Sequence, residues 1–217
     1  MKKLILISAL LLVASNSWAY NEKELAKCVS LNACEGYDLS GASLRFAYLD
    51  GGNLRGANLS GADLYAARLE KANLEGANLE GATMKLTEME GANLEGANLS
   101  SATIANTTNL SYANLRGANL SNARIVGHSN LKKANLEGAN LSGAYLKLAN
   151  LAGVNLAGAN LSGAYLFRIN LSNADLSNAI LHHIDLTRTT LKDAKLDGAK
   201  YCKTKMTWGE LNDHCEE

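Results

Sequence analysis

Residues 57–61 read Ala-Asn-Leu-Ser-Gly, and close copies of this five-residue unit follow one another along most of the chain. Counted by their central residue, there are 32 units between Leu39 and Leu196, within a segment that covers 37–199 of the 217 residues. The central residue is leucine in 28 units and methionine or isoleucine in the rest. Such regularity predicts a repetitive fold and leaves no obvious place for a catalytic triad.

The period of five matches neither the 3.6 residues of a helical turn nor the alternation of a long strand. Within a unit, alanine and leucine lie two positions apart, so in an extended segment they point to the same side, and the Asn or Asp between them points outward. The glycine that follows provides a corner, because glycine tolerates unusual backbone dihedrals. Four sides close a square coil, and the 32 units give eight coils. Parallel strands lie ~4.8 Å apart, so the rod is roughly 38 Å long.

The chain resembles the pentapeptide-repeat proteins, whose consensus is Ala-(Asp/Asn)-Leu-x-x, over about three quarters of its length. The resemblance implies an all-β fold, a right-handed quadrilateral parallel β-helix of about eight coils. It implies little about activity, because most of the family has no assigned function. Some members resemble DNA in shape and charge and protect a type II topoisomerase from quinolone drugs, through an acidic surface and in the cytoplasm.

The first residues are typical of a secretory signal peptide: a basic start, an apolar run over 4–14, and a small-x-small cleavage site that ends at Ala19. The run is too short for a membrane span, and we expect an exported, periplasmic or secreted protein without a membrane span in the mature chain. Loss of Lys2 and Lys3 leaves 19 basic against 21 acidic residues. This balance lacks the basic surface typical of nucleic-acid binding. The expected organisation is a signal peptide (1–19), an N-terminal cap (20–36), the repeats (37–199) and a C-terminal cap (200–217).

The four cysteines lie outside the repeats, where exported proteins usually form disulfides. The two ends of the rod are ~38 Å apart by the stacking estimate, whereas a disulfide needs Cα atoms within ~7 Å. We therefore predict Cys28–Cys34 and Cys202–Cys215; the alternative, a metal site, would have only two cysteine ligands at each end.

Each cap should cover an open end of the solenoid. Residues 21–31 predict a short amphipathic helix, with Asn21 and Glu24 at capping-box spacing. At the other end, the period persists loosely at Tyr201, Met206 and Leu211, and Trp208 is expected to lie over the last leucines.

Assigning the units in rotation to four faces, with Leu39 on face 1, sorts the outward side chains. Faces 1 and 4 carry asparagine columns that should hydrogen-bond between coils. Two one-residue insertions, after Ile104 and Ile125, fall at the same corner of neighbouring coils. They could form a protruding ridge or be tolerated surface insertions. On face 3, inward hydroxyls beside these insertions should satisfy backbone groups; they belong to Thr87, Thr108 and Ser129.

Face 2 comprises the units centred on residues 44, 64, 84, 104, 125, 146, 166 and 186, and it differs from the other faces. Its outward positions include both phenylalanines of the chain, with basic residues among them (Lys85, Lys147, Arg168, Arg188). Such a column is a candidate interaction surface or homodimer contact, although aromatic residues could also simply stabilise the sheet across neighbouring coils. The candidate interaction face consists of Phe46, Tyr65, Leu86, Val126, Tyr145, Leu148, Tyr165 and Phe167.

We expect no enzyme activity, cofactor or metal. His182 and His183 lie at one corner near Asp185 without a third ligand at suitable spacing, which favours a solvated corner over a metal or hydrolase site. The glycines serve corners and form no phosphate loop. The leading hypothesis is therefore an exported scaffold that binds an unknown protein partner, or itself, through face 2. The alternatives are a topoisomerase-protection protein, disfavoured by the signal peptide and neutral charge, and a purely structural envelope protein.

Overall fold

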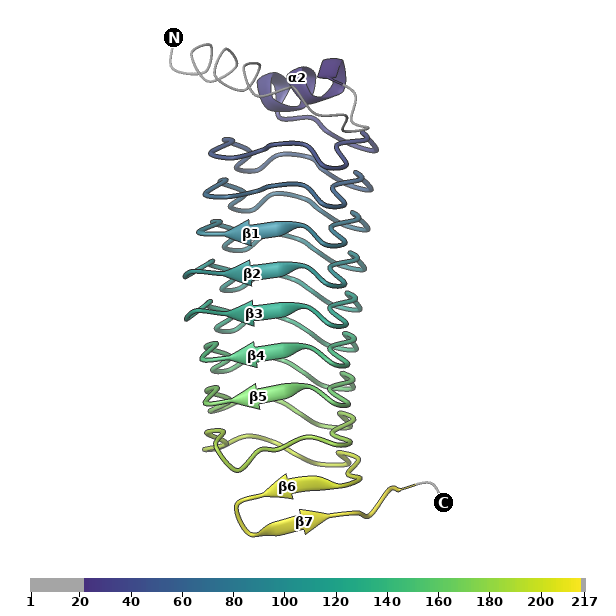
Figure 1. The fold of residues 1–217 in the computed structure, drawn as a ribbon, viewed down its shortest axis with the longest axis vertical. Coiled ribbons are helices and arrows are strands. Elements are labelled where there is room, and N and C mark those ends of the chain that lie inside the picture. The colour runs from purple at the N-terminus through teal and green to yellow at the C-terminus, as the bar shows by residue number, and fades with distance from the viewer. Residues whose placement is uncertain (1–21, 216–217) are drawn as a thin grey trace.

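The chain winds into a stack of four-sided coils, which Figure 1 shows as a rod with one helix at the N-terminal end and a hairpin at the other. The structure, a computed structural model, describes residues 22–215. Parallel bridges join residues one coil apart, such as Asn58 with Asn78, a separation of 20. Across an insertion the separation becomes 21, as between Asn93 and Asn114. The expected parallel solenoid is confirmed.

The interior is filled by the two residues of each unit that were expected to point inward. Leu59 and Ala62, for example, are fully buried, and the central leucines and inward alanines join one continuous core. The corner after Leu59 has a hydrogen bond from the Ala62 N–H to the Leu59 carbonyl (3.0 Å), and Gly61 has φ 65°. A positive φ at this position is what a type II turn requires, which explains the recurring glycine.

Face 2 is the face on which the extended segments become continuous strands. Five of them form one parallel sheet in the order β1 to β5, with one strand from each of five successive coils (Figure 1). Elsewhere along the solenoid the coils are joined by isolated bridges. The strands are β1 (Thr83–Lys85), β2 (Thr103–Ala105), β3 (Arg124–Val126), β4 (Tyr145–Lys147) and β5 (Tyr165–Phe167).

The two insertions stack at one corner, as expected. Thr107 donates its N–H to the carbonyl of Gly127 (3.0 Å), which joins one insertion to the next. The adjacent buried hydroxyls bind backbone carbonyls, also as expected. Thr108 donates to Met84 (2.7 Å) or Ala105 (2.8 Å), and Thr87 and Ser129 make equivalent contacts in the neighbouring coils.

The N-terminal cap is the helix α2 (Glu22–Leu31), which buries Leu25 and Cys28 against the first coil. A disulfide joins Cys28 to Cys34, as predicted. The Glu24 carboxylate also accepts a hydrogen bond from the Asp38 N–H (3.1 Å), which ties the helix to the first repeat. The proposed signal peptide and Asn21 lie outside the described residues.

The C-terminal cap continues the solenoid before it changes direction. Lys205 pairs in parallel with Asp185, so β6 (Thr204–Met206) forms part of a ninth coil, and β7 (Gly209–Leu211) folds back on it antiparallel. The predicted disulfide joins Cys202 to Cys215. Met206 is buried against the last coil, but Trp208 is 68% exposed, so its expected covering role is wrong. Trp208 lies in the turn between the two strands, away from the leucines. None of the helices within residues 22–215 has the length and apolarity of a membrane span.

Candidate interaction surface

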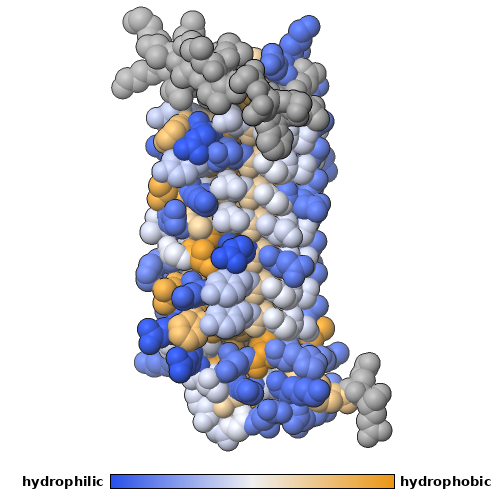
Figure 2. Space-filling model, in the orientation of Figure 1, coloured by the Kyte–Doolittle hydropathy of each residue, from blue (hydrophilic) through white to orange (hydrophobic). Residues whose placement is uncertain are grey.

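The eight residues predicted to form the interaction face all lie at the surface, five of them in or beside strands β3 to β5. Three are exposed, namely Phe46, Leu86 and Tyr165, with exposed fractions between 39% and 51%. The other five are half-buried. In Figure 2, apolar residues alternate with hydrophilic ones along the edge where the strands of Figure 1 end. Exposed aromatic residues are not confined to face 2, since Tyr48 and Tyr112 project from face 3.

A first aromatic cluster lies in the two N-terminal coils. The rings of Phe46 and Tyr65 meet edge to face, with centroids 5.5 Å apart. The Arg45 guanidinium lies 4.2 Å from the centroid of Tyr65 and forms an ion pair with Asp63 (2.9 Å). Its charge is therefore largely balanced within the face.

A second, larger cluster spans β3 to the eighth coil. Tyr145 and Tyr165 are stacked at 4.7 Å, and Tyr165 and Phe167 at 6.0 Å. Cations cover the outer rings of this stack: Arg124 lies 5.2 Å from the centroid of Tyr145, and Arg168 and Arg188 each lie 5.4 Å from that of Phe167. The packing of aromatic residues across coils, which the sequence left as an alternative role, is therefore present. The faces of these rings are turned toward one another and toward cations.

A groove of about 300 Å³ opens at the C-terminal end of this cluster. It lies where the sheet ends after β5 and the eighth coil continues with a bridge at Asp185 instead of a strand. Tyr165, Phe167 and Arg188 contribute to its lining, together with Asp185. Hydrogen bonds from the hydroxyl and the N–H of Thr187 hold the pKa of Asp185 below its usual value, and the charges of Lys205 and Arg188 act in the same direction. Asp185 is thus an anion at neutral pH.

Face 2 is also distinguished by its charge. Its outward positions hold six basic and two acidic residues. Face 1 holds two acidic residues and no basic ones, face 3 five of each, and face 4 five acidic and three basic residues. The neutral total therefore conceals one basic face. Its basic residues are Arg45, Lys85, Arg124, Lys147, Arg168 and Arg188, and its acidic residues are Asp63 and Asp185.

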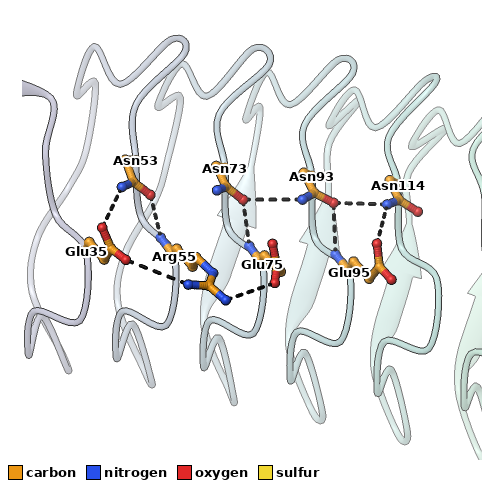
Figure 3. Close-up of polar contacts among 8 residues, drawn as sticks. All are labelled: Glu35, Asn53, Arg55, Asn73, Glu75, Asn93, Glu95 and Asn114. Carbon is orange, nitrogen blue, oxygen red and sulfur yellow. Dashed lines mark hydrogen bonds and ion pairs between the residues drawn. The ribbon is translucent and has the colours of Figure 1, made fainter.

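The basic residues of face 4 are paired, whereas most of those on face 2 are not. Arg55 lies 3.3 Å from Glu75 beside the asparagine column of face 4, as Figure 3 shows. Arg116 on the same face contacts Glu95 at 3.5 Å. On face 2, Arg45 is the one cation with an ion pair among residues 22–215. The other five cations are available to an anionic partner.

The corners of face 2 carry side chains where face 4 carries glycine. Glycine occupies seven of the eight corners of face 4. The equivalent positions of face 2 include Phe46, Leu86 and Leu148, with φ of 57°, 57° and 62°. Bulky residues seldom adopt positive φ, because their Cβ approaches the following carbonyl. These apolar side chains are therefore displayed at a conformational cost.

The histidine corner has a partner that the sequence did not indicate. The C-terminal cap brings His214 beside His182 and His183, around a cavity of about 410 Å³. His214 Nδ1 accepts a hydrogen bond from the Tyr201 N–H (3.3 Å). No group of three potential metal ligands has suitable geometry within residues 22–215. His214 follows the repeats by an irregular path, so no spacing could have placed it.

A family model described as pentapeptide repeats matches the chain in eight copies, over residues 38–76, 62–101, 107–127, 129–166 and 169–207. The chain belongs to the pentapeptide-repeat family. Proteins of this family form right-handed β-helices, so the solenoid of this chain is right-handed. They are in general scaffolds or interaction proteins without catalytic activity. No functionally curated protein matches the sequence.

Solved structures of pentapeptide-repeat proteins resemble this one. QnrB1, a plasmid-mediated fluoroquinolone resistance protein, is 21% identical with a TM-score of 0.61, over 78% of this chain and 89% of its own. HetL, involved in heterocyst differentiation regulation in the cyanobacterium Nostoc sp. strain PCC 7120, is 28% identical with a TM-score of 0.46, over 82% of this chain and 91% of its own. The likeness to QnrB1 is one of fold alone.

Proposed function

We propose that this chain is an exported, non-catalytic scaffold that binds a protein partner through face 2. The observation that carries the proposal is the coincidence, on one face, of apolar side chains and unpaired cations. On the other three faces the net charge of the outward residues is zero or negative. An exposed apolar patch with basic residues is typical of a surface that is covered by another molecule.

The strained corners of face 2 support this assignment. Glycine would serve these corners at lower conformational cost, as it does on face 4. Strained backbone clusters at functional sites. Corners with positive φ also occur on faces 1 and 3, but the two leucines among the described residues with positive φ, Leu86 and Leu148, both lie on face 2, which supports a function beyond folding. The self-packed aromatic stack alone would not require them.

Export is supported by the signal-peptide pattern and by the two disulfides. Structural disulfides persist in oxidising compartments and are rare in reducing ones. We therefore place the mature chain, cleaved near Ala19, in the periplasm or outside the cell. This location and the basic face both distinguish it from the topoisomerase-protection hypothesis, which needs a cytoplasmic protein with an acidic surface.

The proposal is tested by photo-crosslinking in intact cells. A photoreactive residue replaces Leu86 on face 2 or, as a matched control, Glu137 on face 4, in the full-length chain. We expect protein adducts of discrete mass from position 86 and none from position 137. Equal adducts from both positions, or none from either, would contradict a specific face and favour a purely structural role.

A further inference from the structure

We infer that the partner of face 2 presents an acidic, extended peptide segment, which lies along the axis of the solenoid. This inference rests on the proposed function and adds the chemistry of the partner. Five cations carry it: Lys85, Arg124, Lys147, Arg168 and Arg188. Each lacks an ion pair among the described residues, and four of the five are exposed.

The charge distribution selects an anionic partner. Acidic residues neutralise the arginines of face 4, and acidic residues also occur at outward positions of every other face. Face 2 nevertheless has three times as many basic as acidic outward residues. Complementary charge steers association and excludes like-charged partners. The arrangement therefore favours a partner of high negative charge over a neutral one.

The aromatic stack argues for carboxylates rather than nucleobases. Aromatic rings are negative on their faces and positive at their edges. In the larger cluster the faces of Tyr145, Tyr165 and Phe167 are occupied by neighbouring rings and cations. Binding of single-stranded nucleic acid depends on free ring faces on which bases stack. This surface offers ring edges and cations, both of which attract anions.

The dimensions suit a short extended segment. From Lys85 in the third coil to Arg188 in the eighth is five coil steps, or roughly 24 Å. An extended chain covers this length in about seven residues. Alternate residues of such a segment face the same side, so acidic residues at every second position would all face the cations. The groove beside Phe167 and Arg188 lies at the end of this path.

The test measures binding of a fluorescent ten-residue peptide of alternating glutamate and serine to the full, disulfide-bonded chain. Fluorescence anisotropy at low ionic strength should show saturable binding that weakens as salt screens the charges. The double variant Arg168→Glu/Arg188→Glu should weaken binding about tenfold or more, since two attractions become repulsions. The matched control Lys132→Glu/Lys192→Glu changes two exposed face 3 lysines and should bind as the parent does.

Two comparison ligands, an uncharged peptide and an oligonucleotide, test whether the face prefers peptide carboxylates. Weaker binding of a serine–glutamine peptide and of oligothymidylate with five phosphates would support the inference. Tighter binding of the oligonucleotide through Arg168 and Arg188 would overturn it in favour of nucleic acid. Equal binding by both double variants would also overturn it. Concentration-dependent self-association that Arg168→Glu/Arg188→Glu abolishes would assign the face to a second copy, with the acidic face 4 as its complement.

The result of the peptide-binding test can be distinguished from the result of the crosslinking test of the proposed function. Adducts from position 86 together with no binding of the acidic peptide would leave a protein-binding face and reject an acidic partner. Peptide binding without adducts in cells would support the chemistry of the face and reject the proposed cellular role.

Discussion

At the scale of single residues, the outward asparagine serves two purposes at once. The Asn58 Oδ1 accepts the N–H of Ser60 (3.2 Å) and so fixes the start of the turn. Its amide group donates to Asp38 in the coil before (3.0 Å), and its Oδ1 also accepts from Asn78 in the coil after. An aspartate can replace it only as an acceptor, which explains why asparagine dominates the long columns.

The corner residues give a prediction about strain. Ala66 on face 2 has φ 52°, whereas Gly61 in the same coil has φ 65° and open space around an added Cβ. We expect Ala66→Gly to raise the free energy of unfolding by about 1 kcal/mol and Gly61→Ala to lower it by a similar amount. Chemical denaturation of both variants would measure these two changes in the free energy of unfolding. A loss of stability in Ala66→Gly would mean that the corner is not strained.

How far the sequence predicts individual positions depends on whether they belong to the period. Leu59 and Asn58 could be placed because their neighbours one coil away are 20 residues distant. Trp208 and His214 could not, because they follow the last regular unit. Their positions depend on the turn of the C-terminal hairpin and on the path back to Cys215.

At the scale of elements, the sheet β1–β5 and the buried hydroxyls beside it are coupled. The Thr108 hydroxyl donates to the carbonyl of Met84 in β1 or to that of Ala105 at the end of the neighbouring strand β2. Replacement by valine keeps the shape but leaves these acceptors without the hydroxyl. We expect Thr108→Val to lower the free energy of unfolding by about 1–3 kcal/mol.

The matched control for this change is Thr103→Val in β2, which is half-buried. We expect it to alter stability by less than about 0.5 kcal/mol, as is usual for surface changes. Equal losses in the two variants, measured by chemical denaturation, would show that the buried hydroxyl has no particular role.

The sequence predicted the sides of the coil and the corner with the insertions. It did not predict that, within the described repeats, continuous strands would form on face 2 and not on the other three faces. The difference between face 2 and the other faces depends on whether the backbone forms a turn hydrogen bond at the corner after the central residue of the unit. The corner at Leu86 lacks a turn hydrogen bond of the kind that the Ala62 N–H makes to the Leu59 carbonyl, across the corner at Gly61. The composition of the face was visible in the sequence. The ion pairs of Arg55 and Arg116, which distinguish the cations of face 4 from those of face 2, required the structure.

At the scale of the whole molecule, the solenoid is a linear array in which each coil contacts only its neighbours. Stability in such an array is approximately a sum of local terms, so damage at one end need not reach the other. The two disulfides each close a cap and none connects the ends. The caps should therefore open independently.

This independence can be measured in the double variant Cys202→Ser/Cys215→Ser. The lost cross-link closes a loop with a sequence separation of 13, for which chain entropy gives about 3 kcal/mol. Opening of the C-terminal cap should then become about 100-fold more favourable, at 1.4 kcal/mol for each factor of ten. Hydrogen exchange should accelerate at the amides of His183 and Lys205, which bond within the last coils. The amide of Leu59, bonded to Asn78, should exchange as in the parent. Faster exchange at Leu59 as well would show that the rod unfolds as a single unit, so that an open cap exposes face 2 to unfolding along its whole length.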